Sequence, residues 1–590
     1  MLRTRLGGTL DTAALTALGG SALLSSPFFA GEPTVASLAL ATAGSAWLSE
    51  QYLSFWRDRN ALHSKLAIRS DKSPMDPKKG EGGLLLGYST FDGSPIWIDY
   101  ENLMRHVFII GQSGVGKTVA ASLLMYQHIQ NGGGLLFIDG KIDADNIRQI
   151  AHFCALAGRE KEFRVINPDD PDQSNTYNPV YDGDPDEQAS RLLSLIPSTE
   201  GNPGADHYKQ EAAQGVTTLI MALRRAGLVY HIMDLSVLLQ SAQALEELKT
   251  KVEAAAPGSE EAINYALFLE KFRSPANDPR NPNAGSVDVK KLKDTFGGIG
   301  GRLFQFGTGN YGRIMKTYDP EVRLYDAIRK NQIVYVALPT MGKDISAENF
   351  GKIVISDLRT AVSWLQKLPK EDRPWPPYMC FCDEAGAYVG KTWPRLFEQA
   401  RSAQIFMMPA VQTFANFKAV SDDLAEMVKG NSWTKVYFKI GTQASAEEAA
   451  DEIGMETGVA QTLSGGKNES SSANIANPAP VGSAGDGTNL TASEKEEECY
   501  RVSPDELKKL DKGEAVMTYG GDLLYNIRIP KLDITKTMQK RLGTVRINHK
   551  RPAYGIKGAD FFANVPRYLD LSAARPTPKK EKRPKDSDTD

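Results

Sequence analysis

The stretch VFIIGQSGVGKTVAASLLMYQ, residues 107–127, constrains the fold more than any other part of the chain. Its first four residues are apolar and predict a short buried strand, and the residues from 119 to 129 predict a helix. Between them, Gly111 to Thr118 have the spacing Gly-x-x-x-x-Gly-Lys-Thr, in which glycines let successive backbone N–H groups point at one anion. Strand, loop and helix in this order predict a phosphate loop that binds a nucleoside triphosphate.

The side chains of this loop have expected roles in binding the triphosphate and its metal ion. Lys117 is predicted to bridge the β- and γ-phosphates, and the Thr118 hydroxyl is predicted to ligate Mg²⁺. ATP and Mg²⁺ are therefore the expected cofactors. The predicted nucleotide-binding residues are Gly111, Gln112, Ser113, Gly114, Val115, Gly116, Lys117 and Thr118.

A phosphate loop needs a second strand that ends in a carboxylate, and two apolar runs qualify. LLFID ends at Asp139, and YMCFCDE ends in the pair Asp383 and Glu384. In the pair, Asp383 is predicted to hold the magnesium shell and Glu384 to polarise the attacking water as general base. The pair favours hydrolysis coupled to work over kinase chemistry. Asp139 is expected to support the loop or the end of the neighbouring strand.

Two polar residues beyond the acid pair are further candidate catalytic residues. Arg401 precedes the apolar run IFMMPAVQ and could contact a phosphate bound to a neighbouring subunit, a role worth on the order of 10³-fold or more in rate. Gln412 ends that run, at the usual place for a sensor of the γ-phosphate. The alternatives are a surface salt bridge for Arg401 and a capping amide for Gln412.

The 590 residues exceed what one core can hold, and the pattern of apolar runs divides them. Strands alternating with helices predict an α/β domain with a doubly wound, mostly parallel sheet, built from residues 84–185 and 301–545. Residues 186–300 have helical periodicity and predict an all-α domain inserted into it. Residues 57–83 are expected to form a polar linker on the cytoplasmic side.

Two segments have the composition of disordered chain. Residues 464–498 are rich in Gly, Ser and Asn, and the tail at 571–590 is charged and proline-rich. The simpler interpretation of 464–498 is a solvated loop, and the alternative is an element that binds a partner.

The N-terminal residues 1–56 are predicted to form a membrane anchor of two transmembrane helices. The segments 12–30 and 33–49 carry no charge, and each is near the length needed to cross a hydrocarbon core of about 30 Å. Basic residues precede the first segment and follow the second, which favours a hairpin with both ends in the cytoplasm. The alternative is a pair of soluble helices that pack on the body of the protein.

The overall charge gives no sign of a nucleic-acid partner. The net charge is −3, so any contact with nucleic acid must be local.

Several further phrases of the sequence occur, in the same order, in one protein family. They are GQSGVGKT, LLFIDGK, SNTYNP, YMCFCDEAG, EQARSAQIFMMPAVQ and VKGNSWTKVYFKI. On these phrases, the hydrophobic N-terminus and the helical insertion, the chain resembles the type IV coupling proteins, the TraD/TraG-like ATPases of bacterial conjugation and type IV secretion. FIDGK, PYMCFCDE and NFGKIVISDLR are most similar to the branch that includes the DotL-like and IncI-plasmid coupling proteins.

The resemblance implies a RecA-like motor that is anchored in the bacterial inner membrane by more than one span, with most of the chain in the cytoplasm. It implies a homo-oligomer, a hexameric ring, that hands a relaxase–DNA complex or effector proteins to the components of a secretion channel. Arg401 matches the arginine-finger position of the family, and Gln412 matches the sensor. The chain departs from many relatives at its N-terminus, where only Gly31 and Glu32 separate the two apolar segments.

Three functions remain open at this point. The first is a motor that moves DNA by sequence-independent contacts with its phosphates. The second is a coupling protein that delivers only proteins, through adaptors. The third is a mainly structural substrate receptor in which ATP turnover is incidental, against which Glu384 and Arg401 argue.

Overall fold

The computed structural model describes most of the chain from residue 83 to residue 532. The described ranges are 83–90, 93–196, 203–275, 285–342, 344–390, 393–467, 488–521 and 523–532. The predicted membrane anchor, the linker apart from its last residue and the C-terminal tail lie outside them. Within these ranges, no helix is long and apolar enough to cross a membrane.

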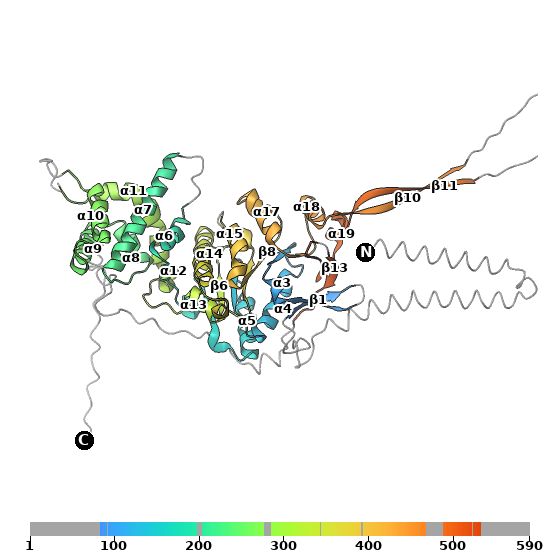
Figure 1. Cartoon of the computed structure of the whole chain (residues 1–590), viewed down its shortest axis with the longest axis horizontal. Helices are drawn as coiled ribbons and strands as arrows, with labels where there is room; N and C mark the ends of the chain where they lie inside the picture. The colour runs from blue at the N-terminus through green and yellow to red at the C-terminus, as the bar shows by residue number, and fades with distance from the viewer. Residues whose placement is uncertain are drawn as a thin grey trace, which may run out of the picture.

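A mixed sheet lies in the middle of the molecule, between a helical block at one end and a long hairpin at the other (Figure 1). In the described ranges the sheet has eleven strands, in the order β2-β1-β13-β12-β9-β3-β8-β7-β4-β6-β5. The seven strands from β9 to β5 are parallel, and β12, β13, β1 and β2 extend them as an antiparallel flank. The prediction of an α/β fold with a large parallel sheet is confirmed.

The strands of the sheet have the following bounds. The parallel strands are β3 (Val107–Ile110), β4 (Leu135–Asp139), β5 (Phe163–Ile166), β6 (Ile333–Ala337), β7 (Tyr378–Asp383), β8 (Ile405–Val411) and β9 (Thr434–Tyr437). The antiparallel strands are β1 (Gly83–Ser89), β2 (Pro95–Asp99), β12 (Glu514–Tyr519) and β13 (Leu523–Arg528).

Helices cover both faces of the parallel strands, so these strands are apolar on both sides. Every residue of β4, β6, β7 and β8 is buried. Alternate residues enter two separate cores: Phe108 and Ile110 face one, and Val107 and Ile109 face the other. The second core includes α4 and α5, and the first includes α14, α15, α17 and α18.

The helices around the sheet have the following bounds. They are α3 (Tyr100–Leu103), α4 (Lys117–Gln130), α5 (Ala144–Leu156), α13 (Leu324–Arg329), α14 (Asp344–Gln366), α15 (Pro394–Gln399), α16 (Ala415–Lys418), α17 (Asp422–Asn431), α18 (Gln443–Ile453) and α19 (Pro504–Lys509), with a short 3₁₀ turn at Ala400–Ala403.

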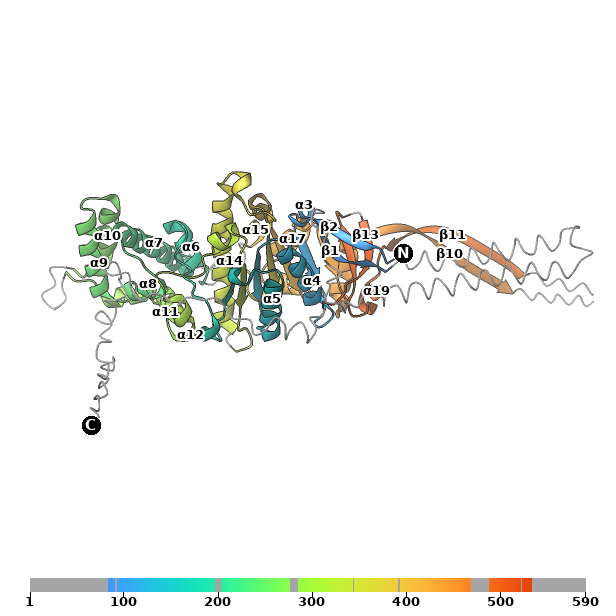
Figure 2. The same cartoon turned by 90° about the horizontal axis from the view of Figure 1, so that it is seen from below.

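The helical block lies beyond the β5 end of the sheet, as the view from below shows (Figure 2). It consists of α6 (Pro185–Leu193), α7 (Pro203–Arg225), α8 (Ile232–Leu238), α9 (Ala242–Ala255), α10 (Glu260–Phe272), α11 (Val289–Gly307) and α12 (Gly309–Met315). The block is therefore longer than the predicted range of 186–300. The glycine-rich run FGGIGGRLF lies inside α11, because Phe296, Ile299 and Leu303 recur at helical spacing and are buried.

A buried ion pair joins this block to the body. Nη2 of Arg191 on α6 lies 2.8 Å from Oδ1 of Asp357 on α14, and the Tyr177 hydroxyl donates to Oδ2 of the same carboxylate at 2.8 Å. All three side chains are buried. Removal of one partner would leave a buried charge unpaired, which typically costs about 3–5 kcal/mol.

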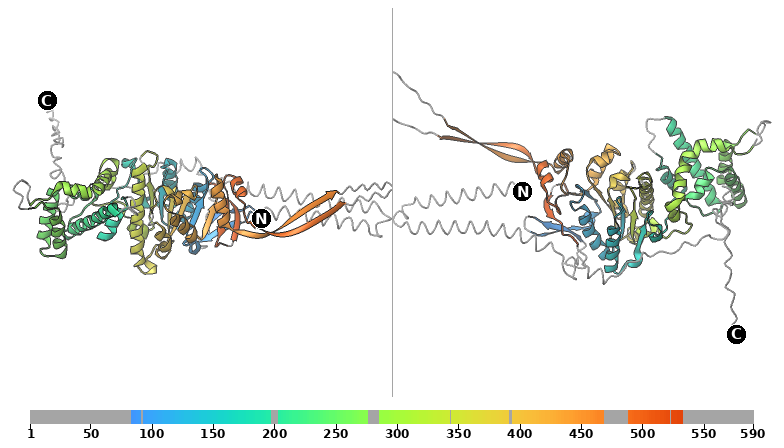
Figure 3. Two further views of the ribbon diagram at one scale, coloured as in Figure 1. Left: turned by 90° about the horizontal axis from the view of Figure 1, so that it is seen from above. Right: turned by 180° about the vertical axis from the view of Figure 1, so that it is seen from behind.

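The long hairpin corrects part of the prediction of disorder at 464–498. β10 (Met455–Lys467) pairs antiparallel with β11 (Thr488–Tyr500), in the register Ser464↔Thr491 and Thr457↔Glu498. The two strands project from the end of the molecule opposite the helical block, as the views from above and behind also show (Figure 3). Composition alone misses such strands, because a backbone ladder forms without a large apolar core. Residues 468–487 lie outside the described ranges.

Candidate nucleotide site

The phosphate loop connects β3, which lies between β8 and β9 in the sheet, to the first turn of α4. Gly111 has no room for a side chain, because a Cβ there would lie 2.5 Å from Cβ of Phe438. Gly116 has φ 125°, a conformation that residues with a side chain rarely adopt. The backbone N–H of Gly111 donates to Val411 O at 3.2 Å, and that of Gln112 donates to Lys439 O at 2.9 Å. Both neighbouring strand ends thus hold the start of the loop.

The Lys117 ammonium is held inside the curve of the loop. Its Nζ donates to Gly111 O at 2.6 Å and to Gln112 O at 3.3 Å, and its side chain is buried. Burial lowers the pKa of Lys117, while the charges of Glu384 and Asp383 act in the opposite direction. The Lys117 ammonium is therefore close enough to both carboxylates for their charges to act on it.

The acid pair is located where β7 ends. Asp383 is 2% exposed, and burial, with the charges of Glu384 and Asp139, raises its pKa to about 6. A buried carboxylate at the end of a strand, next to a phosphate loop, suits a divalent cation that also binds phosphate oxygens. Thr118 follows Lys117 in the first turn of α4, and its hydroxyl is the second protein oxygen that would fit such an ion. No cluster of three or more His, Cys, Asp or Glu ligands occurs within the described ranges.

Glu384 directly follows Asp383, and its backbone has the left-handed values φ 50° and ψ 43°. Gln412, directly after β8, donates from Nε2 to Oε1 of Glu384 at 2.9 Å. Lys141 forms an ion pair with the same oxygen. Since β3, β8 and β7 are neighbours in the sheet, Lys117, Asp383, Glu384 and Gln412 meet at the carboxyl ends of three adjacent parallel strands.

Asp139 supports the connection that follows its own strand, β4. Its carboxylate accepts hydrogen bonds from the backbone N–H groups of Lys141 and Asp143, from the amide of Asn146 and from the Tyr335 hydroxyl. These bonds fix the connection between β4 and α5.

Lys141 is a site residue that sequence reasoning missed. Burial lowers its pKa, but the hydrogen bond and charge of Glu384, with the charges of Asp383 and Asp139, outweigh that effect and raise it. The sequence contained an indication of this role, because Lys141 directly follows the predicted strand and its carboxylate in the run LLFIDG.

Arg401 lies at the opposite edge of the sheet. It belongs to the 3₁₀ turn before β8, whereas Gln412 follows β8. A strand of seven residues separates the two, which is about 23 Å at about 3.3 Å per residue. Arg401 therefore does not meet the phosphate loop of its own chain, and the role that the sequence predicts for it requires a neighbouring subunit.

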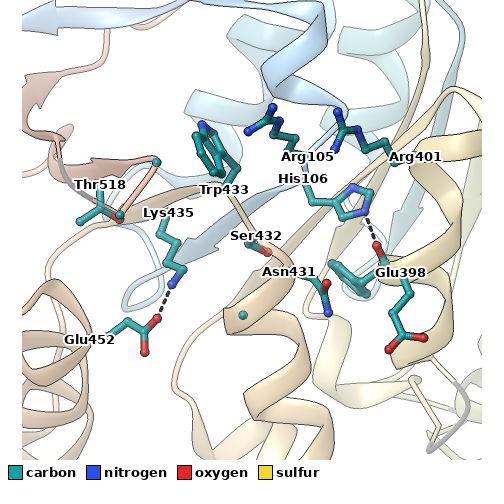
Figure 4. A pocket seen from close by; sticks show the side chains of 14 residues that line it. Arg105, His106, Glu398, Arg401, Asn431, Ser432, Trp433, Lys435, Glu452 and Thr518 are labelled. Atoms are coloured by element: carbon teal, nitrogen blue, oxygen red, sulfur yellow. Dashed lines mark hydrogen bonds and ion pairs between the residues drawn. The ribbon is translucent and has the colours of Figure 1, made fainter.

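Arg401 lines a cavity of about 480 Å³ together with Arg105, His106, Asn431 and Trp433 (Figure 4). The Arg105 guanidinium lies 4.3 Å from the centroid of the Trp433 ring, which is a stacking distance. On the far side, Lys435 forms an ion pair with Glu452. The sequence did not point to Arg105 or Trp433, because the order β9-β3-β8 brings together segments that are far apart in the chain.

Comparisons with known proteins show which proteins the chain resembles. Residues 377–512 match the family model described as the TraM recognition site of TraD and TraG. The type 4 coupling protein DotL of Legionella pneumophila is 24% identical over 401 residues, 62% of this chain and 51% of DotL. The chain resembles the type IV coupling proteins. The region that matches the family model runs from β7 to α19, so it includes the acid pair, Arg401 and Gln412. The chain spans about half the length of the curated coupling protein it matches.

One solved coupling protein has a similar fold. A structure of the plasmid coupling protein TrwB in complex with the non-hydrolysable ATP analogue ADPNP is 12% identical, with a TM-score of 0.50. The similarity covers 75% of this chain and 88% of that one. VirB4 of Thermoanaerobacter pseudethanolicus is 15% identical, covers 77% of this chain and 97% of its own, and has a TM-score of 0.44.

Proposed function

We propose that this chain is a coupling ATPase that hydrolyses ATP to drive substrate into a type IV secretion channel. The substrates are relaxase-bound single-stranded DNA, effector proteins or both. The observation that carries the proposal is the meeting of Lys117, Asp383, Glu384 and Gln412 at the ends of three adjacent parallel strands. The similarity to DotL and to the TraD and TraG family model supports the secretion role.

The proposed mechanism assigns one task to each side chain. Backbone N–H groups of residues 111–118 and the Lys117 ammonium bind the triphosphate. Asp383 and the Thr118 hydroxyl would hold Mg²⁺, which would supply positive charge to the phosphates. Glu384 accepts a proton from the attacking water, while Gln412 and Lys141 keep its carboxylate oriented.

The position of Arg401 supports assembly into a ring. Because Arg401 lies a strand length away from its own phosphate loop, it acts on the nucleotide of a neighbouring subunit in the proposed hexamer. The N-terminal segment of residues 1–56 would anchor this ring in the bacterial inner membrane, with the described domains in the cytoplasm.

The proposal is tested by ATP hydrolysis with the full-length protein in detergent, alone and with single-stranded or duplex DNA over a salt series. Lys117→Ala and Glu384→Gln should abolish turnover, and Glu384→Gln should retain ATP binding. Stimulation by DNA that fades as salt rises supports a DNA substrate. A rate of ATP hydrolysis that does not change when DNA is added favours the interpretation that the substrates are proteins. Binding of ATP without any turnover in the unaltered protein would contradict the motor function.

A further inference from the structure

His106 lines the same cavity as Arg401 and comes immediately before β3 (Figure 4). Its side chain is 1% exposed, and its backbone has φ 70°. Nδ1 accepts a hydrogen bond from the backbone N–H of Met407 at 3.1 Å. Nε2 lies 2.7 Å from the carbonyl oxygen of Phe397. Because the Met407 N–H can only donate, Nδ1 is the acceptor, and Nε2 carries the proton and donates to Phe397.

The imidazole is neutral at physiological pH. Burial lowers the pKa of His106 to about 4, and the positive charge of Arg401 acts in the same direction. Both nitrogens therefore keep fixed roles, one as donor and one as acceptor.

The two hydrogen bonds of His106 reach residues on either side of Arg401 in the chain. Phe397 belongs to α15 and Met407 to β8, and Arg401 lies in the turn between them. The Phe397 and His106 rings are also in edge-to-face contact, with centroids 5.3 Å apart. His106 thus holds both ends of the segment that presents Arg401.

The same residue belongs to the strand that enters the phosphate loop. β3 has only four residues, Val107 to Ile110, and Gly111 follows directly. The strand is about 13 Å long, and its four residues are all buried, so a displacement at one end moves the other. The backbone carbonyl of His106 also accepts a hydrogen bond from the N–H of Thr434 at 3.3 Å. His106 therefore also holds the segment next to Trp433, on the other side of the cavity.

A second anchor holds the turn independently of β3. Gln366 at the end of α14 donates to the Ser402 hydroxyl at 2.6 Å and to the Gln399 carbonyl at 3.1 Å. The turn therefore has support for its folding without His106. What His106 adds is a fixed position of Arg401 relative to the phosphate-loop strand.

We propose that His106 is a positioning residue that holds Arg401 in register with β3, so that the nucleotide site of one subunit and the arginine offered to the next subunit move together. The inference rests on the proposed function, because it concerns the arginine of a ring-forming ATPase.

The test is a double-mutant cycle in the full-length protein. His106→Phe removes both hydrogen bonds and retains an aromatic ring against Phe397. Its kcat should fall at least about tenfold, since a misplacement of about 1 Å can cost 10²-fold, while its KM for ATP stays constant. Because His106 acts through Arg401, adding His106→Phe to Arg401→Ala should cause no further loss of kcat.

Conservative variants and a matched control complete the design. His106→Asn places an acceptor near the position of Nδ1 and tolerates the left-handed backbone, so it should recover part of the lost kcat. His128 is another fully buried histidine, and it bonds Tyr100 and Gly134 rather than the Arg401 segment. His128→Phe should lower stability but leave kcat unchanged, both on its own and in combination with Arg401→Ala.

Three kinds of outcome overturn the inference. Multiplicative loss in the His106→Phe, Arg401→Ala protein, or a rise in KM with unchanged kcat, would overturn it while the proposed ATPase function stands. Wild-type turnover in Arg401→Ala would overturn it together with the arginine-finger role. Absence of hydrolysis in the unaltered protein would overturn both this inference and the proposed function.

Discussion

Gln412 donates a 2.9 Å hydrogen bond from Nε2 to Oε1 of Glu384 and so links the end of β8 to the acid at the end of β7. The same carboxylate oxygen pairs with Lys141, which follows β4 on the other side of β7. Donors from both neighbouring strands therefore fix the orientation of the candidate general base.

Removal of the Gln412 amide should slow the chemical step. In Gln412→Ala, Glu384 keeps only the Lys141 contact at Oε1, and we expect kcat for ATP hydrolysis to fall about tenfold, part of the 10²- to 10⁴-fold that general base catalysis contributes. Gln412→Glu should be slower still, because two carboxylates then face each other. Steady-state hydrolysis measures both.

Gln443→Ala is the control, since Gln443 is exposed and bonds Glu447 on α18. A higher KM with unchanged kcat would instead place Gln412 in nucleotide binding.

Gly140 keeps the space beside the acid pair open. A Cβ at this position would lie 3.0 Å from Asp383 O and 3.1 Å from Cβ of Glu384. Gly140→Ala should therefore displace Glu384 and lower kcat about tenfold or more, with little change in ATP affinity. Gly342→Ala is the matched control, because nothing lies within 4 Å of a Cβ there. Hydrolysis and fluorescent-nucleotide binding separate the two effects, and an unchanged kcat in Gly140→Ala would show that the neighbours can yield.

The parts of the site that the sequence predicted are local in the chain. A strand, a glycine loop and a helix are contiguous between Val107 and Gln130, and the acid pair follows its own apolar run. Parallel strands place their carboxyl ends at one edge, so the convergence of Lys117, Glu384 and Gln412 follows once each run is read as a strand.

The parts that the sequence did not predict depend on contacts between distant segments. β1 pairs with β13, so that Tyr88 lies opposite Arg528. Arg105 stacks on Trp433 only because β9 lies beside β3 in the sheet. Neither pairing has a local pattern, since strand order is decided by packing across the whole domain. The all-α range was predicted to end at residue 300, whereas α11 continues to Gly307, because buried apolar residues recur at helical spacing among its glycines.

The glycines of α11 give a pair of stability predictions with opposite signs. A Cβ at Gly297 meets nothing within 4 Å, so Gly297→Ala should stabilise the helix by about 0.5–1 kcal/mol through its higher helix propensity. At Gly307 a Cβ would lie 2.7 Å from the Met233 sulfur, so Gly307→Ala should destabilise the block. Hydrogen exchange of α11 amides reports both changes. Equal effects of the two substitutions would contradict the packing of α11 on α8.

Buried His128 should make the stability of the protein fall in acid. Its Nε2 lies 3.1 Å from Gly134 O, its Nδ1 lies 3.2 Å from the Tyr100 hydroxyl, and burial lowers its pKa to about 3. In the unfolded chain the pKa is 6.5. The unfolded state thus binds more protons between these values. The contribution of His128 to the free energy of unfolding is complete above pH 6.5 and is lost as the pH falls towards 3. The slope of this loss is about 1.4 kcal/mol per pH unit.

Substitution isolates this effect from that of the other buried histidines. His128→Gln should lower stability at pH 7 and flatten the decline between pH 6 and pH 4, because the residue that replaces it does not titrate. His207→Gln is the control, since His207 is exposed on α7 and its change should leave the slope as it is. Urea unfolding at a series of pH values, followed by the fluorescence of the tryptophans, measures the slope. An unchanged slope in His128→Gln would mean that this imidazole takes up its proton without unfolding the domain, which its 0% exposure and its two bonded nitrogens argue against.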